Sequence, residues 1–343
     1  MKSTLFKLFG CLQDLNLRKV SHNFRNFIDD VQPPSFLTSL FFNVQTEMIS
    51  FELIFPAGSK SFGGTQRFYV EFKKHENGCI VQWYNKRKLM RKFLEDRDFV
   101  TAALHDFQNL MTHQKSILSM FRLEFEYHRK ETNRMEVDRK LEPIANILLS
   151  KIKEILNFRP LKVEDLSMSV IRQEQVLEIL PFIDPKFIRK IKLDGKKSFP
   201  MNTFEVDQLE KLEQWKNAKE LKIWRYDMSI PIERFSNFQK VQLFSQTITT
   251  ESILSLKNTF LLPSCNIENF SIKYKFIDDL RFLTHSFGPF MEETDQYGVN
   301  EKRWIMKVPR SLKMLSISIF SSSFITFERV ERGQISLRIR PLD

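Results

Sequence analysis

The chain has 343 residues, enough to bury a sizeable core and to form one to three domains. Hydrophobic residues make up 42% and charged residues 28%, as in ordinary globular proteins, and no apolar stretch approaches the ~20 residues that span a bilayer. The net charge of +11 favours anionic partners, although basic and acidic residues are interleaved. The 9 glycines argue against glycine-rich nucleotide loops, and the 3 separated cysteines argue against a disulfide framework, so we expect an intracellular protein, in the cytoplasm or the nucleus.

Two short amphipathic helices are predicted at the N-terminus, before Pro33 and Pro34. Apolar residues recur at helical spacing in residues 5–12 and again in residues 17–28. Helices of this length are unstable alone, so their apolar stripes must pack against the rest of the chain or against another protein. The periodicity leaves both alternatives open.

Residues 36–97 predict a small antiparallel β meander. Segments 49–55, 68–72 and 80–84 are rich in aromatic and β-branched residues and alternate or run apolar. The intervening loop at residues 58–64 contains Gly-Ser-Lys-Ser, but its residue order and its strand-to-strand context do not match a phosphate-binding loop.

From residue 98 to about residue 290, helix and strand signals alternate, with helices predicted at 100–117, 138–157 and 205–215. Because the predicted strands are short and recur irregularly, the pattern predicts an α/β class with an irregular leucine-rich-repeat-like solenoid. A doubly wound sheet shares this alternation and is the alternative, although no glycine-rich turn opens a helix. Residues 291–343 are rich in strand signals and are expected to cap the array.

The N-terminal helices also carry a family resemblance. Residues 17–25, Leu-Arg-Lys-Val-Ser-His-Asn-Phe-Arg, resemble the second half of an F-box, and residues 6–12 resemble its preceding helix. The Leu-Pro pair that usually opens this motif is absent, and the link between Leu12 and Leu15 is short. The resemblance implies that residues 1–34 bind the Skp-type subunit of a cullin–RING ubiquitin ligase. The expected contact residues are Leu5, Leu8, Phe9, Leu12, Leu15, Leu17, Val20 and Phe24.

A second resemblance covers roughly residues 140–290. Residues 205–221, with the sequence EVDQLEKLEQWKNAKEL, resemble the signature of the FTH domain, and segments 175–184, 235–238 and 249–257 fit the same family in order. Such domains follow an N-terminal F-box in a large nematode-type protein family. The resemblance implies a non-catalytic adaptor whose C-terminal array recruits a protein substrate.

Pattern and resemblance together predict four parts: F-box-like helices at 1–34, a β-rich meander at 36–97, an α/β array at 98–290 and a strand-rich cap at 291–343. None of the six histidines forms an H-E-x-x-H motif or lies near a cysteine pair, and no nucleophile elbow is present. We therefore expect no enzyme activity, metal or cofactor, and no membrane partner. The alternative functions are a basic nucleic-acid- or anion-binding protein without a ligase role and, less favoured, an enzyme built on the array.

Strand alternation suggests where a substrate would bind. Leu221 and Ile223 favour the core, which turns their sequence neighbours outward, and Phe270 and Ile272 do the same in the predicted strand 267–274. The candidate substrate-binding residues are Lys222, Trp224, Tyr226 and Lys273, a basic and aromatic set that suits an acidic or phosphorylated protein segment. A merely solvated sheet face is the alternative. Trp215, in register with Leu209 and Leu212 on a predicted helix, is expected in the core.

Overall fold

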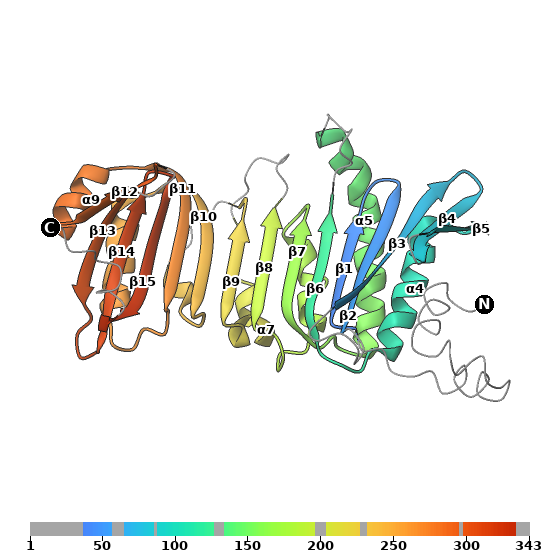
Figure 1. Cartoon of the computed structure of the whole chain (residues 1–343), viewed down its shortest axis with the longest axis horizontal. Helices are drawn as coiled ribbons and strands as arrows, with labels where there is room; N and C mark the ends of the chain where they lie inside the picture. The colour runs from blue at the N-terminus through green and yellow to red at the C-terminus, as the bar shows by residue number, and fades with distance from the viewer. Residues whose placement is uncertain are drawn as a thin grey trace. The chain divides into compact units, whose positions relative to one another are not determined.

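The structure is a computed structural model that describes residues 37–56, 65–85, 88–126, 134–195, 204–226, 232–294 and 298–333. The chain divides into two units, Met1–Ile188 and Arg189–Asp343. The first unit runs from blue to green in Figure 1, and the second runs from yellow to red. The predicted N-terminal helices at 1–34 lie outside the described residues.

The described part of the first unit is a mixed sheet in the strand order β7-β6-β1-β2-β3-β4-β5. Strands β1 to β5 pair antiparallel in chain order, whereas β1 also pairs parallel with β6, and β6 with β7. The strands are β1 (Ser39–Val44), β2 (Met48–Pro56), β3 (Thr65–His75), β4 (Gly78–Asn85), β5 (Lys88–Glu95), β6 (Leu118–Phe125) and β7 (Val163–Val170).

Two long helices, α4 (Phe99–His113) and α5 (Arg134–Phe158), bury apolar faces in this unit. Asp98 starts α4, because its carboxylate accepts hydrogen bonds from the backbone N–H groups of Val100 and Thr101, both at 3.0 Å. Helix α4 contacts β2, β3, β4 and α5. Its buried Phe107 meets the ring of Phe42 at 5.7 Å between centroids, so aromatic packing holds the helix to the sheet. Two short elements, α6 (Glu174–Leu177) and η1 (Leu180–Phe182), follow β7.

The described part of the second unit is also a mixed sheet, in the order β8-β9-β10-β11-β15-β14-β13-β12. Strands β8 to β11 pair parallel, β11 pairs antiparallel with β15, and the remaining pairs are antiparallel. The strands are β8 (Lys190–Gly195), β9 (Glu220–Trp224), β10 (Lys240–Ile248), β11 (Asn269–Ile277), β12 (Met291–Thr294), β13 (Asn300–Lys307), β14 (Lys313–Phe320) and β15 (Phe324–Glu331). Short helical elements connect the parallel strands: η2 (Leu209–Lys211), α7 (Glu213–Asn217), η3 (Ile232–Phe235) and α8 (Thr250–Leu261); α9 (Leu280–Phe287) follows β11.

Side-chain contacts fix these connections to the sheet of the second unit. Trp215 of α7 is buried, as expected, and its ring meets that of Phe238 edge-on at 5.1 Å between centroids. At the end of α8, the guanidinium of Arg329 on β15 donates hydrogen bonds to the backbone carbonyls of Phe260, Leu262 and Cys265. A cation at this position satisfies carbonyls that have no partner within the helix.

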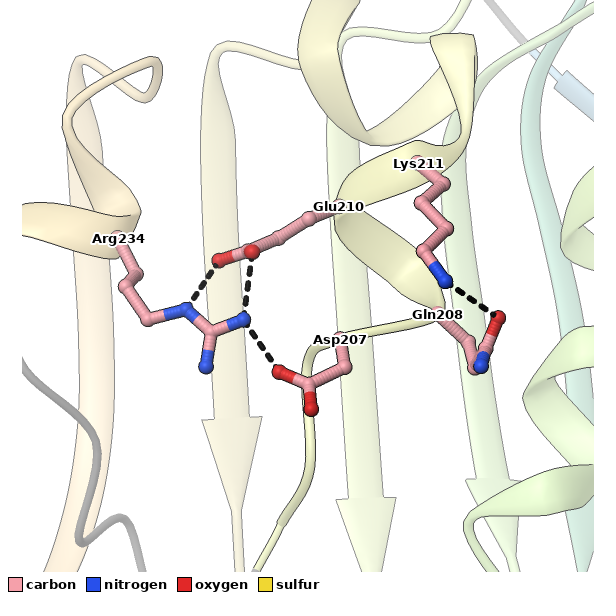
Figure 2. A network of polar contacts seen from close by, with 5 residues as sticks. All are labelled: Asp207, Gln208, Glu210, Lys211 and Arg234. Carbon is pink, nitrogen blue, oxygen red and sulfur yellow. Dashed lines mark hydrogen bonds and ion pairs between the residues drawn. The ribbon is translucent and has the colours of Figure 1, made fainter.

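A polar network joins the segment before β9 to the segment after it (Figure 2). The guanidinium of Arg234 donates to both carboxylate oxygens of Glu210, at 2.8 and 2.6 Å, and also binds Asp207. Beside it, Lys211 donates to Gln208 at 3.4 Å. The hydrogen bonds from Arg234 to Glu210 and Asp207 raise the pKa of that guanidinium, so Arg234 is charged at every physiological pH.

For the described residues, the predicted fold class, an α/β leucine-rich-repeat-like solenoid, is wrong; the F-box-like helices that belong to the same prediction lie outside them. Fifteen strands dominate the described residues and form mixed sheet, with antiparallel pairs in both units. A solenoid would repeat one strand–helix unit in chain order, whereas the described residues between the strands β1–β5 and between the strands β12–β15 contain no helix. Strand β1 also inserts between β2 and β6, so spatial order departs from chain order. The alternation in the sequence does not encode these nonlocal pairings.

Candidate partner-binding face

The predicted contacts with a Skp-type subunit are not tested by the structure. All eight residues, from Leu5 to Phe24, lie outside the described residues. The predicted substrate-binding residues, in contrast, lie in the described part of the second unit.

Strand β9 alternates as its sequence predicts. Leu221 and Ile223 are buried, while Lys222 and Trp224 lie on the less buried face of the sheet. Strand register extends this face across the neighbouring strands, where Lys192, Phe244, Lys273 and Phe324 lie on it. We call this surface the open face and define it by Lys192, Lys222, Trp224, Phe244, Lys273 and Phe324.

Two lysines of the open face oppose each other. Lys192 of β8 is the register partner of Lys222 of β9. The nearby carboxylates bind other cations: Glu220 lies 3.3 Å from both Lys190 and Lys240, and Asp194 binds Arg225 at 3.0 Å. Among the described residues, neither member of the lysine pair forms an ion pair.

This arrangement shifts the pKa values on the face. Burial lowers the pKa of Lys222, and the positive charges of Lys192 and Lys190 lower it further, while the negative charge of Asp194 opposes the shift in part. Burial alone would raise the pKa of Glu220, but the hydrogen bonds from Lys190 and Lys240 overcome this effect and lower it. The face therefore holds two lysines that repel each other, beside Glu220, whose negative charge is already balanced by Lys190 and Lys240. An anion that binds between Lys192 and Lys222 would relieve their repulsion.

Aromatic rings lie beside these lysines. The ammonium of Lys222 lies 4.9 Å from the ring centroid of Trp224, and that ring lies 6.5 Å from the ring of Phe324. Lys273 is exposed and lies in register between Phe244 of β10 and Phe324 of β15. Carboxylate or phosphate groups could bind the ammonium groups while an apolar side chain packs on the rings.

Tyr226, the remaining predicted residue, does not join the open face. Its side chain is 5% exposed and packs against Phe204 at 5.0 Å between ring centroids. Strand β9 ends at Trp224, and Arg225 has a positive φ of 62°, so the strand alternation stops before Tyr226. Gly195 permits this turn, because an added Cβ there would lie 2.9 Å from the carbonyl oxygen of Arg225.

Lys192, Phe244 and Phe324 belong to the open face but were not predicted. Alternation with the buried residues of β8 and β10 could have identified Lys192 and Phe244. Phe324 could not be found in this way, because it joins the face only through the antiparallel pairing of β15 with β11. No local sequence pattern specifies that pairing.

The chain is similar in sequence to one known protein family and to one known protein. Residues 146–290 match the FTH domain model. Over 317 residues the chain is 24% identical to F-box A protein 224 of Caenorhabditis elegans, an alignment that covers 90% of this chain and 75% of that protein. No solved structure matches the chain. These matches confirm the resemblance to nematode-type F-box proteins that carry an FTH domain.

No group of three or more histidine, cysteine, aspartate and glutamate side chains in the described residues is placed to hold a metal ion. Within the same residues, every helix is too short or too polar to cross a membrane.

Proposed function

From the similarity of this chain to nematode F-box proteins with an FTH domain, we propose that it is a non-catalytic adaptor of a Skp–cullin–F-box ubiquitin ligase. Residues 1–34 bind the Skp-type subunit, and the open face binds an acidic or phosphorylated segment of a protein substrate. The adaptor accelerates ubiquitin transfer by proximity, because it raises the effective concentration of substrate lysines near the ubiquitin-conjugating enzyme.

The similarity across 90% of the chain supports the adaptor role, and the opposed pair Lys192 and Lys222 supports the choice of substrate surface. Like charges directly opposite each other in a sheet are destabilising. Neither lysine forms an ion pair with the described residues, and the nearby Asp194 binds Arg225, so the pair favours an anionic ligand. The adjacent rings of Trp224 and Phe324 favour a ligand that is also partly apolar.

Affinity purification of the full chain with two sets of variants tests both halves of the proposal. We expect Leu12→Asp or Val20→Asp to abolish recovery of Skp and cullin subunits, because an unpaired charge in an apolar interface costs several kcal/mol. The double variant Lys192→Glu/Lys222→Glu should keep these subunits and lose the other partners. Retention of Skp by both N-terminal variants would contradict the adaptor role, and unchanged partners in the double variant would contradict the substrate surface.

The alternative is a nucleic-acid- or anion-binding protein without a ligase role, which the net charge of +11 and the lysines of the open face favour. Salt dependence distinguishes the two. Binding to phosphates weakens steeply as salt rises, because counterions are released. Docking of apolar helices on a Skp-type subunit should change little over the same range.

A further inference from the structure

Strand β5 forms a regular edge of the sheet in the first unit. Among the described residues, it pairs with β4 and with no other strand. Its residues pair with β4 in an unbroken register, from Gly78 opposite Glu95 to Asn85 opposite Lys88. Edge strands are usually protected by proline, by a bulge, by short length or by charged side chains; of these, β5 carries only the charges, which repel other basic strands but not acidic ones. Strand β5 has eight residues, no proline and no bulge in its pairing, so its outer backbone N–H and C=O groups can pair with another strand.

Apolar side chains are exposed beside this edge. Tyr84 is 59% exposed, Phe93 46% and Leu89 37%. Tyr84 and Leu89 are register partners, and the pairing of Val70 with Trp83 places Tyr69, 40% exposed, beside Tyr84. Exposed apolar residues that gather in one place mark an interaction surface more often than isolated ones do.

The charge of the edge indicates what would bind there. Lys88, Arg91 and Lys92 are exposed, and none of them forms an ion pair with the described residues. Arg91 lies on the same side of the strand as Leu89 and Phe93, because side chains alternate along a strand. Along that side, an apolar side chain (Leu89) is followed by a basic one (Arg91) and then by an apolar one (Phe93). With Glu95, the strand carries three basic residues and one acidic residue, so its net positive charge disfavours a second copy of the same edge and attracts an acidic strand.

We propose that β5 is a docking edge at which an extended, acidic segment of a partner protein adds as a further strand. Its backbone pairs with the outer edge of β5, its apolar side chains pack on Leu89 and Phe93, and its carboxylates bind Arg91 and its basic neighbours. This surface belongs to the first unit and does not use the open face, so the two proposals can fail independently.

A labelled peptide provides the test. The probe is a fluorescein-labelled, acetylated peptide of the same length as β5 in which pairs of glutamates alternate with pairs of valines, so that each face of its strand alternates acidic and apolar side chains. We expect it to bind the full chain in fluorescence anisotropy and to slow hydrogen exchange at the amides of residues 88–95. A peptide with lysine in place of glutamate should not bind, and neither should one with central prolines, which cannot pair as a strand.

Two variants of the chain test the residues. Lys88→Glu/Arg91→Glu should weaken peptide binding by about ten-fold or more, and Leu89→Ser/Phe93→Ser should weaken it without changing the charge. The matched control is Lys115→Glu/Lys186→Glu, which changes the net charge equally at exposed positions of the same unit and should bind normally. Thermal unfolding of each variant shows that the fold is kept.

Three results would overturn the proposal. Equal binding by Lys88→Glu/Arg91→Glu and by its matched control would mean that only net charge matters. Self-association that protects residues 88–95 without peptide would identify a second copy as the occupant. A labelled single-stranded DNA oligonucleotide that binds more tightly than the peptide, and loses binding in the same variant, would identify a nucleic-acid surface.

Discussion

Lys192 and Lys222 lie opposite each other in the parallel pair of β8 and β9, and neither binds a carboxylate among the described residues. A glutamine at either position would remove their repulsion. Residues that cost stability are frequent at binding surfaces, because function can require a locally unfavourable arrangement. This repulsion is one reason why we propose an anionic ligand for the open face.

The first prediction is that Lys222→Gln separates stability from binding. Removing the like charge stabilises the sheet, while losing the cation–π contact with Trp224 destabilises it. Because each effect is worth up to about 1 kcal/mol, the free energy of unfolding in urea should change by less than about 1 kcal/mol. Binding of a phosphorylated or glutamate-rich peptide should weaken clearly.

Lys216→Gln is the matched control, because Lys216 pairs with the exposed Glu213 away from the strands of the open face. It should keep full peptide binding. A large loss of stability in Lys222→Gln would show that Lys222 is a structural residue instead.

The second prediction concerns Trp215, which is buried against Phe238. Trp215→Ala should cost ~3–5 kcal/mol, because it removes a large buried side chain and leaves a cavity. Trp215→Phe should cost much less, since it keeps an aromatic ring and removes an indole N–H that has no hydrogen-bond partner in the structure. Thermal melts of both variants check this order, and an unchanged midpoint in Trp215→Ala would contradict burial.

The third prediction concerns the link between β15 and α8. Arg329→Ala removes the hydrogen bonds to the carbonyls of Phe260, Leu262 and Cys265. We expect a loss of about 1.5–3 kcal/mol, the usual range for hydrogen bonds to a charged group, and faster hydrogen exchange at the C-terminal end of α8. Arg329→Lys should recover only part of the stability, because one ammonium cannot reach the same carbonyls in a fixed fork. Equal stability of the lysine and alanine variants would contradict this geometric explanation.

Local patterns predicted much of the secondary structure. The predicted helices at 100–117 and 138–157 correspond to α4 and α5, where apolar residues recur at helical spacing over several turns. The predicted helix at 205–215 is instead the short η2 followed by the start of α7. Here Leu209 and Trp215 are buried by irregular turns, which can produce the same apolar spacing as a continuous helix.

Pairing between distant strands could not be predicted from the sequence. Strand β1 pairs with β6, and β11 pairs with β15, although long segments separate the partners in the chain. Such pairings depend on the packing of whole faces rather than on local propensity. For the same reason the sequence placed Lys222, Trp224 and Lys273 on the outward side of their strands but did not identify Phe324 beside them.

The fourth prediction concerns Cys79, which is fully buried on β4. Burial raises the pKa of its thiol to about 12, and the negative charge of Asp98 adds to this shift. The unfolded thiol has a pKa of about 8.5, so the contribution of Cys79 to stability is complete below that pH and is lost as the pH rises toward 12. As the pH rises through this range, the free energy of unfolding should therefore fall less in Cys79→Val than in the unmodified chain.

Thiol labelling provides an independent check of Cys79. In a Cys11→Ser/Cys265→Ser background, Cys79 is the remaining thiol, and iodoacetamide at mildly alkaline pH should modify it only as fast as the first unit opens. Urea should accelerate labelling in parallel with unfolding measured by circular dichroism. Rapid labelling of the folded chain would mean that the thiolate forms readily in the native state, which contradicts a pKa raised by burial. Restoring Cys265 is the control: its sulfur is partly exposed, so it should react before Cys79 does.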